Sequence, residues 1–124
     1  MDPPAGKVAS YTIPEGQEAI FMWWMDTAYH DFNKTMPKAQ EYGGSGVGSA
    51  DLRVIGRNQA ELLGWDPIDM AVAEEIGCWF YLQGKTARLI SDYQVRRRGK
   101  PDTWFDSTVY TMMARRLQEV GRWP

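Results

Sequence analysis

Hydrophobic and polar side chains alternate along most of this chain with a period of about 3.6 residues, which is the pattern of amphipathic helices. The pattern is clearest between Asp66 and Gly99, where no proline interrupts it beyond Pro67. Asp66 followed by Pro67 predicts a helix start, and Gly99 after Arg96, Arg97 and Arg98 predicts its end. We therefore expect the longest helix of the protein over about residues 66–98.

Two shorter helices are expected before it. From Glu15 onward the residues are helix-compatible and apolar on nearly all sides until Pro37, which should kink or end that helix. The glycine-rich segment 43–49 favours a loop, because glycine gives the backbone more freedom than a helix tolerates well. A second helix, of at most about four turns, should begin just after this loop and end at Gly64.

The last helix is predicted from Pro101 to about Val120. Thr103 and Asp106 stand three residues apart, as in a capping box with Asp in place of Glu, and Gly121 supplies a stop.

Two glycines, Gly77 and Gly84, lie within the long helix. Each costs the helix up to about 1 kcal/mol relative to alanine, so we expect both to permit close approach by another helix. At 124 residues the chain has the size of one domain. We predict an all-α four-helix bundle over residues 15–124, preceded by an extended, flexible N-terminal arm at residues 1–14.

Composition and charge exclude several classes of protein. A net charge of −2 argues against a protein that coats nucleic acid. No apolar run in the first part of the chain is long enough for a signal peptide or a membrane span, so no membrane partner is expected. The single cysteine, Cys78, excludes an internal disulfide and favours a cytoplasmic location. The excess of aromatic residues favours a homo-oligomer.

Some motifs fail on spacing or context. Gly84-Lys85-Thr86 lacks the upstream glycine of a Walker A loop, because Trp79 stands there, and no strand precedes the glycine-rich segment as a dinucleotide-binding fingerprint requires. His30 is the only histidine, which excludes a multi-histidine zinc site. Cys78 is expected to be a buried, inert thiol.

Lys85 and Arg88 follow one another along one side of the long helix. In a groove, these cations would face phosphate groups, whereas on an open face they would simply be solvated. If Asp106 and Tyr110 of the last helix pack nearby, Asp106 instead pairs with Lys85 or Arg88 and fixes the register of the two helices. The sequence leaves these alternatives open.

Acidic side chains at one-turn spacing on facing helices hold magnesium in all-helical nucleotide pyrophosphatases. The candidates here are Asp69, Glu74, Glu75, Asp102 and Asp106. The adjacent Glu74 and Glu75 point about 100° apart on a helix, so they do not easily chelate one ion together. A structural role is therefore the favoured interpretation of these residues.

Several short motifs occur together in a recognisable order. They are Tyr42-Gly43, Asn58, Trp65, Asp69, Lys85, Arg88, Asp102, Asp106 and Tyr110. This order resembles small helical proteins of tailed phages that are related to the MazG-like group, and the resemblance covers about residues 38–120.

MazG-like enzymes hydrolyse nucleoside triphosphates to monophosphate and pyrophosphate, using magnesium held by Glu-x-x-Glu on one helix and Glu-x-x-Asp on another. In this chain Cys78 stands at the second position of the first motif and Thr103 at the first position of the second. The resemblance therefore leaves only Glu75 and Asp106 as metal ligands.

The leading hypothesis is a phage-type accessory protein that binds a nucleotide or a nucleotide-derived signalling molecule without cleaving it and so counters host defence. Lys85 and Arg88 would bind phosphate, Trp104 or Trp79 would stack on the base, and Tyr110 completes the predicted ligand-binding set. No catalytic residue and no resident cofactor are assigned.

Two alternatives stay open. One is a divergent pyrophosphohydrolase dependent on magnesium, held by Glu75 and Asp106. The other is a protein-binding module that acts on a host protein through aromatic anchors. These anchors would be Phe21, Trp23 and Trp24 of the first helix and the tail Arg122-Trp123-Pro124.

Overall fold

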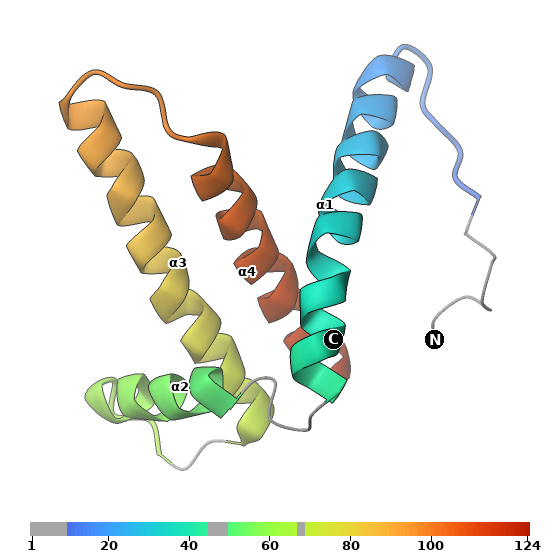
Figure 1. Ribbon diagram of the computed structural model, residues 1–124. Helices are drawn as coiled ribbons and strands as arrows, with labels where there is room; N and C mark the ends of the chain where they lie inside the picture. Colours follow the sequence, from blue (N-terminus) through green and yellow to red (C-terminus); the bar gives the residue numbers. More distant parts are fainter. Residues whose placement is uncertain (1–9, 45–49, 67–68) are drawn as a thin grey trace.

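The computed structural model describes residues 10–44, 50–66 and 69–124, with the backbone alone for residues 41–44. Its four helices are α1 (Glu18–Gly44), α2 (Ala50–Leu62), α3 (Met70–Gln94) and α4 (Pro101–Val120), and the described residues contain no strand (Figure 1). The predicted all-α class is confirmed.

Helices α3 and α4 run side by side in opposite directions, and α2 lies across the first turns of α3 (Figure 1). Leu52 of α2, Cys78 of α3 and Leu117 of α4 are buried together where the three helices meet. Half-buried side chains pack around this core: Tyr81, Tyr110, Met113, Ala114 and Trp123. Helices α2, α3 and α4 therefore form the packed part of the fold.

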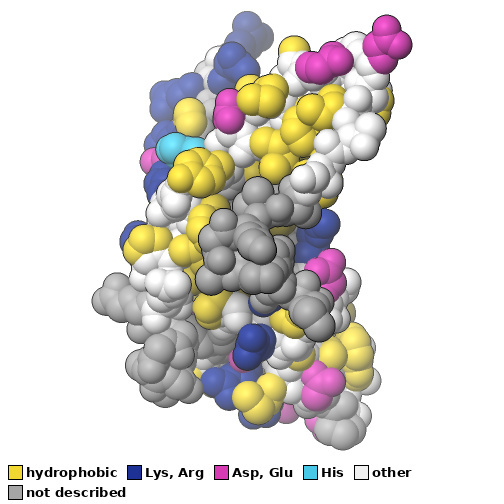
Figure 2. Space-filling model, turned by 90° about the vertical axis from the view of Figure 1, so that its right-hand side faces the viewer, with side chains coloured by type: hydrophobic (Ala, Val, Ile, Leu, Met, Phe, Trp, Pro, Cys, Tyr) yellow, Lys and Arg dark blue, Asp and Glu magenta, His cyan; other side chains and the backbone are white. Residues whose placement is uncertain are grey.

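Helix α1 lies beside α4 and approaches it through residues 34–39, while its N-terminal turns stand apart from the other helices (Figure 1). Hydrophobic side chains gather over these turns on the face shown in Figure 2. Exposed on α1 are Ile20, Met22, Trp23, Trp24, Met25, Tyr29 and Phe32. The helix thus carries much apolar surface that its own fold does not cover.

The sequence predicts that Pro37 kinks or ends the first helix. Pro37 does not end α1, which continues to Gly44. The chain is thus still helical at Gly43 and Gly44, where the predicted loop should begin, and residues 45–49 lie outside the described residues. Residues 10–14 form neither helix nor strand, and the rest of the predicted arm, residues 1–9, also lies outside them.

Close approach of α2 to α3 rests on two glycines. A Cβ at Gly77 would collide with the backbone of Leu52, so this predicted close contact is confirmed. A Cβ at Gly56, for which no close contact was predicted, would collide with the backbone of Ala73. The prediction for Gly84 is wrong, since nothing lies near the place where its Cβ would be.

The limits of α3 differ from prediction at both ends. The helix begins at Met70 because Asp69, not Asp66, is the N-cap, and its Oδ1 accepts a hydrogen bond from the backbone N–H of Val72 at 2.8 Å. It ends at Gln94 instead of reaching Gly99, and with 25 residues it is not the longest helix as predicted, since α1 has 27. Arg96 has φ of 56°, a left-handed conformation in which helices commonly end, although glycine is its usual occupant.

The predicted limits of α4, Pro101 and Val120, are confirmed, with Gly121 left-handed at φ of 76°. The predicted capping box is absent. Lys100 is the N-cap residue and makes no capping bond with its side chain, while Thr103 lies inside the helix and is buried. Gly64 is also left-handed and follows α2 as predicted.

Candidate functional site

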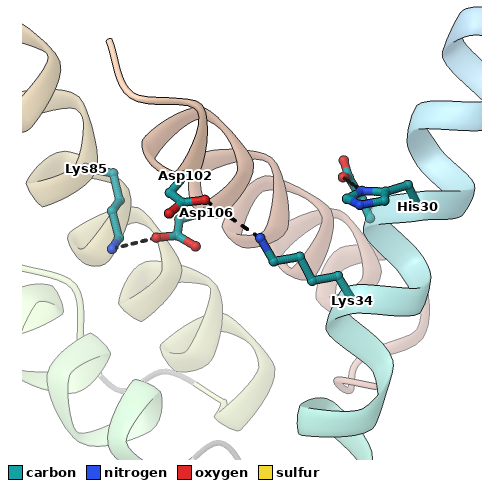
Figure 3. Close-up of polar contacts among 6 residues, drawn as sticks. His30, Lys34, Lys85, Asp102 and Asp106 are labelled. Carbon is teal, nitrogen blue, oxygen red and sulfur yellow. Dashed lines mark hydrogen bonds and ion pairs between the residues drawn. The ribbon is translucent and has the colours of Figure 1, made fainter.

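A charged pair joins the middle of α3 to α4. Lys85 Nζ lies 3.0 Å from Asp106 Oδ2, and the lysine side chain is largely buried (Figure 3). Of the alternatives that the sequence left open for Lys85, the structure shows the pairing that fixes helix register. The ammonium group offsets the charge of the Asp106 carboxylate.

Two tyrosines stack one turn below this pair. The rings of Tyr81 on α3 and Tyr110 on α4 lie nearly parallel, at 11°, with centroids 5.4 Å apart. Tyr81 donates its hydroxyl hydrogen to Asp51 Oδ2 on α2 at 3.4 Å, so one side chain links three helices. Burial raises the pKa of both phenols, and the nearby carboxylate of Asp51 raises the pKa of Tyr81 further. Both tyrosines therefore stay protonated at neutral pH.

A groove of about 310 Å³ opens beside these tyrosines, between α1, α2 and α4. It is lined by Lys34, Thr35, Lys38, Ala39, Asp51, Leu52, Tyr81, Phe105, Asp106, Val109, Tyr110, Met113 and Trp123. The lining joins apolar and aromatic side chains with a few charged groups, the composition expected of a small-molecule site.

The cations of this groove come from α1. The ammonium group of Lys34 lies 4.1 Å from the ring centroid of Phe105, a cation–π contact. It also lies 3.8 Å from Asp102 Oδ1, an ion pair drawn in Figure 3. Asp102 is almost fully exposed, so solvent weakens that ion pair. Lys38 follows Lys34 by one helical turn and lies on the same side of α1.

The residues beneath the groove are buried. Cys78 is 1% exposed, and burial, followed by the nearby carboxylates of Glu74 and Glu75, raises its pKa to about 12. Its thiol is therefore protonated and poorly nucleophilic, as the sequence predicts. Trp123 packs against this core and lines the groove, which makes the C-terminal tail part of the site.

A second charged pair joins α2 to α3, outside the groove lining. Arg53 Nε is 3.1 Å from Glu74 Oε1, at ion-pair distance but without the alignment of a hydrogen bond. Burial raises the pKa of the Glu74 carboxyl, while the charge of Arg53 lowers it. Neither residue lines the groove.

The structure brings together only some of the predicted site residues. Asp106 and Tyr110 line the groove, and Lys85 reaches it indirectly through Asp106. Arg88 and Trp104 are exposed and Glu75 is half-buried, and none of these three is in the lining.

Sequence reasoning missed Lys34, Lys38 and Phe105 as groove residues. The spacing of the two lysines, four residues on a helix, was the only available pattern that places them together.

The predicted magnesium ligands do not form a set that fits the ion. Asp106 is held by Lys85, and Glu75 lies outside the groove lining. Among the residues that the structure describes, no three His, Cys, Asp or Glu side chains gather as a metal site needs. His30 is exposed, and its Nδ1 lies 3.3 Å from Asp31 Oδ1 (Figure 3).

Comparison with known proteins gives no match to a protein family model, to a curated protein or to a solved structure. Within the described parts of the chain, no helix is both long enough and apolar enough to cross a membrane.

Proposed function

We propose that the protein binds a nucleotide or a nucleotide-derived signalling molecule in the groove between α1 and α4, without cleaving it. The observation that carries this proposal is the meeting of two lysines from α1 with aromatic side chains of α4 and the tail around one groove. Its volume of about 310 Å³ falls in the range of small-molecule sites. A phage-type role against host defence stays a prediction from the resemblance.

Phosphate is the part of such a ligand that the lysines suit. Of the two carboxylates that line the groove, Asp106 is offset by Lys85, whereas Asp51 accepts a hydrogen bond from the neutral Tyr81 hydroxyl and keeps its charge. Lys38, and Lys34 with its solvent-weakened ion pair to Asp102, are the cations in the lining, and an ammonium group is a compact phosphate binder. This differs from the sequence-based hypothesis, in which Lys85 and Arg88 bind phosphate.

The base is the part that the aromatic side chains suit. Phe105, Tyr110 and Trp123 line the same groove as the lysines. Stacking of a base on an aromatic ring contributes about 1–3 kcal/mol and depends little on which base is bound. The groove therefore favours the nucleotide class rather than one particular base.

Titration calorimetry with nucleoside triphosphates, monophosphates and cyclic nucleotides tests the proposal. We expect Lys38→Ala to weaken binding about tenfold, since it removes one charge-assisted contact of about 1.4 kcal/mol. Lys100→Ala, which removes an exposed lysine away from the groove, should leave the affinity unchanged. The absence of binding heat with every nucleotide, or an unchanged affinity of Lys38→Ala, contradicts the proposal.

The role of Lys85 is tested separately. If Lys85 acts by neutralising Asp106, Lys85→Ala weakens binding because an uncompensated carboxylate then faces the phosphate. The double variant Lys85→Ala with Asp106→Ala should recover most of the affinity. Direct phosphate binding by Lys85 predicts no such recovery.

Hydrolysis is the alternative that the sequence left open with Glu75 and Asp106 as ligands. Of these only Asp106 lines the groove, together with Asp51, and Asp106 would have to exchange its ion pair with Lys85 for the metal. Phosphate oxygens would have to complete the coordination of magnesium around Asp51 and Asp106. Release of pyrophosphate from a nucleoside triphosphate with magnesium, lost in Asp106→Asn, would establish the enzyme and replace the binding proposal.

A further inference from the structure

Helix α1 leaves unusually large side chains in solvent. Trp24 is 66% exposed and Tyr29 is 71% exposed, and five further large apolar side chains of the helix are exposed as well. Four of these seven side chains, Met22, Met25, Tyr29 and Phe32, lie on one side of the helix, and over two copies they present on the order of 1,000 Å² of apolar surface, about the minimum for a specific interface. A monomer in water gains nothing from this surface.

Part of this surface forms a regular seam. Met22, Met25, Tyr29, Phe32 and Met36 follow one another at alternating spacings of three and four residues. This is the spacing with which one helix packs along another in a coiled coil. The first four of these side chains are exposed and Met36 is half-buried.

The seam lies on the side of α1 opposite the groove. At 100° per residue, the centre of the seam and the direction of Lys34 and Lys38 are about 180° apart. The lysines line the groove that faces α4. A helix packed on the seam therefore leaves the groove open to a ligand.

We propose that the occupant of this seam is α1 of a second copy of the chain, packed antiparallel about Tyr29. In this pairing Met22 faces Met36 of the other copy and Met25 faces Phe32. Tyr29 faces the Tyr29 of the other copy. Every pair of facing side chains is therefore predominantly apolar. The sequence of the seam is thus complementary to itself, as a two-fold interface requires.

Charge selects the antiparallel direction. Glu18 continues the seam toward the N-terminus and is exposed. Parallel copies would place each Glu18 against its counterpart, and like charges at such a contact repel. Antiparallel copies place Glu18 near Gln40 of the other copy. They also place Asp26, which lies beside the seam, near Asn33. The side-chain amides of Gln40 and Asn33 donate hydrogen bonds to these carboxylates.

The test is the mass of the protein in solution without any nucleotide, so its outcome is independent of the proposed function. Light scattering after gel filtration should give twice 14.2 kDa for the wild-type chain. Tyr29→Glu should give the monomer mass, because it sets two carboxylates face to face at the centre of the interface. Val54→Glu changes another exposed apolar residue, on α2, and should leave the dimer intact.

Cross-linking tests the direction. Cys78 is buried, so disulfides that form between copies on oxidation come from the introduced cysteines. A mixture of the Met22→Cys and Met36→Cys variants should form the mixed disulfide, whereas Met22→Cys alone should not cross-link to itself. A monomeric wild-type chain or a dimeric Tyr29→Glu variant overturns the proposed dimer, and self-cross-linking of Met22→Cys overturns its antiparallel direction.

Discussion

Glu74 is the charged side chain buried most deeply among the described residues, with 7% of its surface exposed. Removing a carboxylate from water disfavours its charged form, so burial raises the pKa, and the nearby Arg53 opposes this change in part. Since the folded pKa lies above the unfolded one, the folded state holds this proton more tightly. The contribution of the Glu74 carboxyl to stability is therefore fully present below its unfolded-state pKa, and it is lost as the pH rises through its folded-state pKa.

Arg53→Ala should destabilise the fold by about 2 kcal/mol at neutral pH, because it leaves the Glu74 carboxylate buried without its partner. The loss should shrink as the pH is lowered, because protonation of Glu74 removes the unpaired buried charge. Urea unfolding over a series of pH values measures this change. Adding Glu74→Gln to Arg53→Ala should remove the extra pH dependence, and its persistence would assign the effect to another group.

At the scale of elements, the α2–α3 crossing depends on two positions without a side chain. Gly56 and Gly77 bring each helix against the backbone of the other, at Ala73 and Leu52 respectively. The same helix α3 carries Gly84 with open space around it. By helix propensity alone, replacing either Gly77 or Gly84 with alanine should stabilise α3. At Gly77, the collision with the backbone of Leu52 makes the same replacement destabilising.

Gly77→Ala should destabilise the protein by about 1–3 kcal/mol, since the added methyl group forces the two helices apart. Gly84→Ala should stabilise it by up to about 1 kcal/mol, because alanine favours the helix and meets nothing. Thermal unfolding of both variants beside the wild type gives the comparison. Equal effects of the two substitutions would mean that α2 and α3 do not approach at Gly77.

At the scale of the whole molecule, α2, α3 and α4 share a core, whereas α1 is attached through its C-terminal half. A helix with few buried contacts opens at a lower free energy than the rest of the fold. The two lysines of the groove lie on this helix. Pairing of two copies through the seam would hold α1 in place and with it the phosphate-binding side of the groove.

Hydrogen exchange measured by mass spectrometry should show this division. In Tyr29→Glu, the amides of residues 18–32 should exchange much faster than in the wild-type chain, while the middle of α3 keeps its protection. The control is Val54→Glu, which should match the wild type in both regions. Equal protection of α1 in the two variants would show that α1 is stable without a second copy.

The sequence alone determined the elements. Apolar periodicity gave the number of helices, and left-handed glycines at Gly64 and Gly121 marked two of the ends, since these are local properties of the backbone. The end of α3 was missed because Arg96, not glycine, takes the left-handed conformation there. The start was missed because Asp66 and Asp69 are both good caps, and local sequence does not rank them.

Tertiary structure decided which side chains meet. Asp106 and Tyr110 were predicted site residues and line the groove, but Lys34 and Lys38 come from a helix whose position no local pattern specifies. The pairing of Lys85 with Asp106 was one of several options until α3 and α4 were placed side by side. Helix formation depends on neighbours within a few residues, whereas a binding groove depends on distances between residues far apart in the chain, and only packing fixes these.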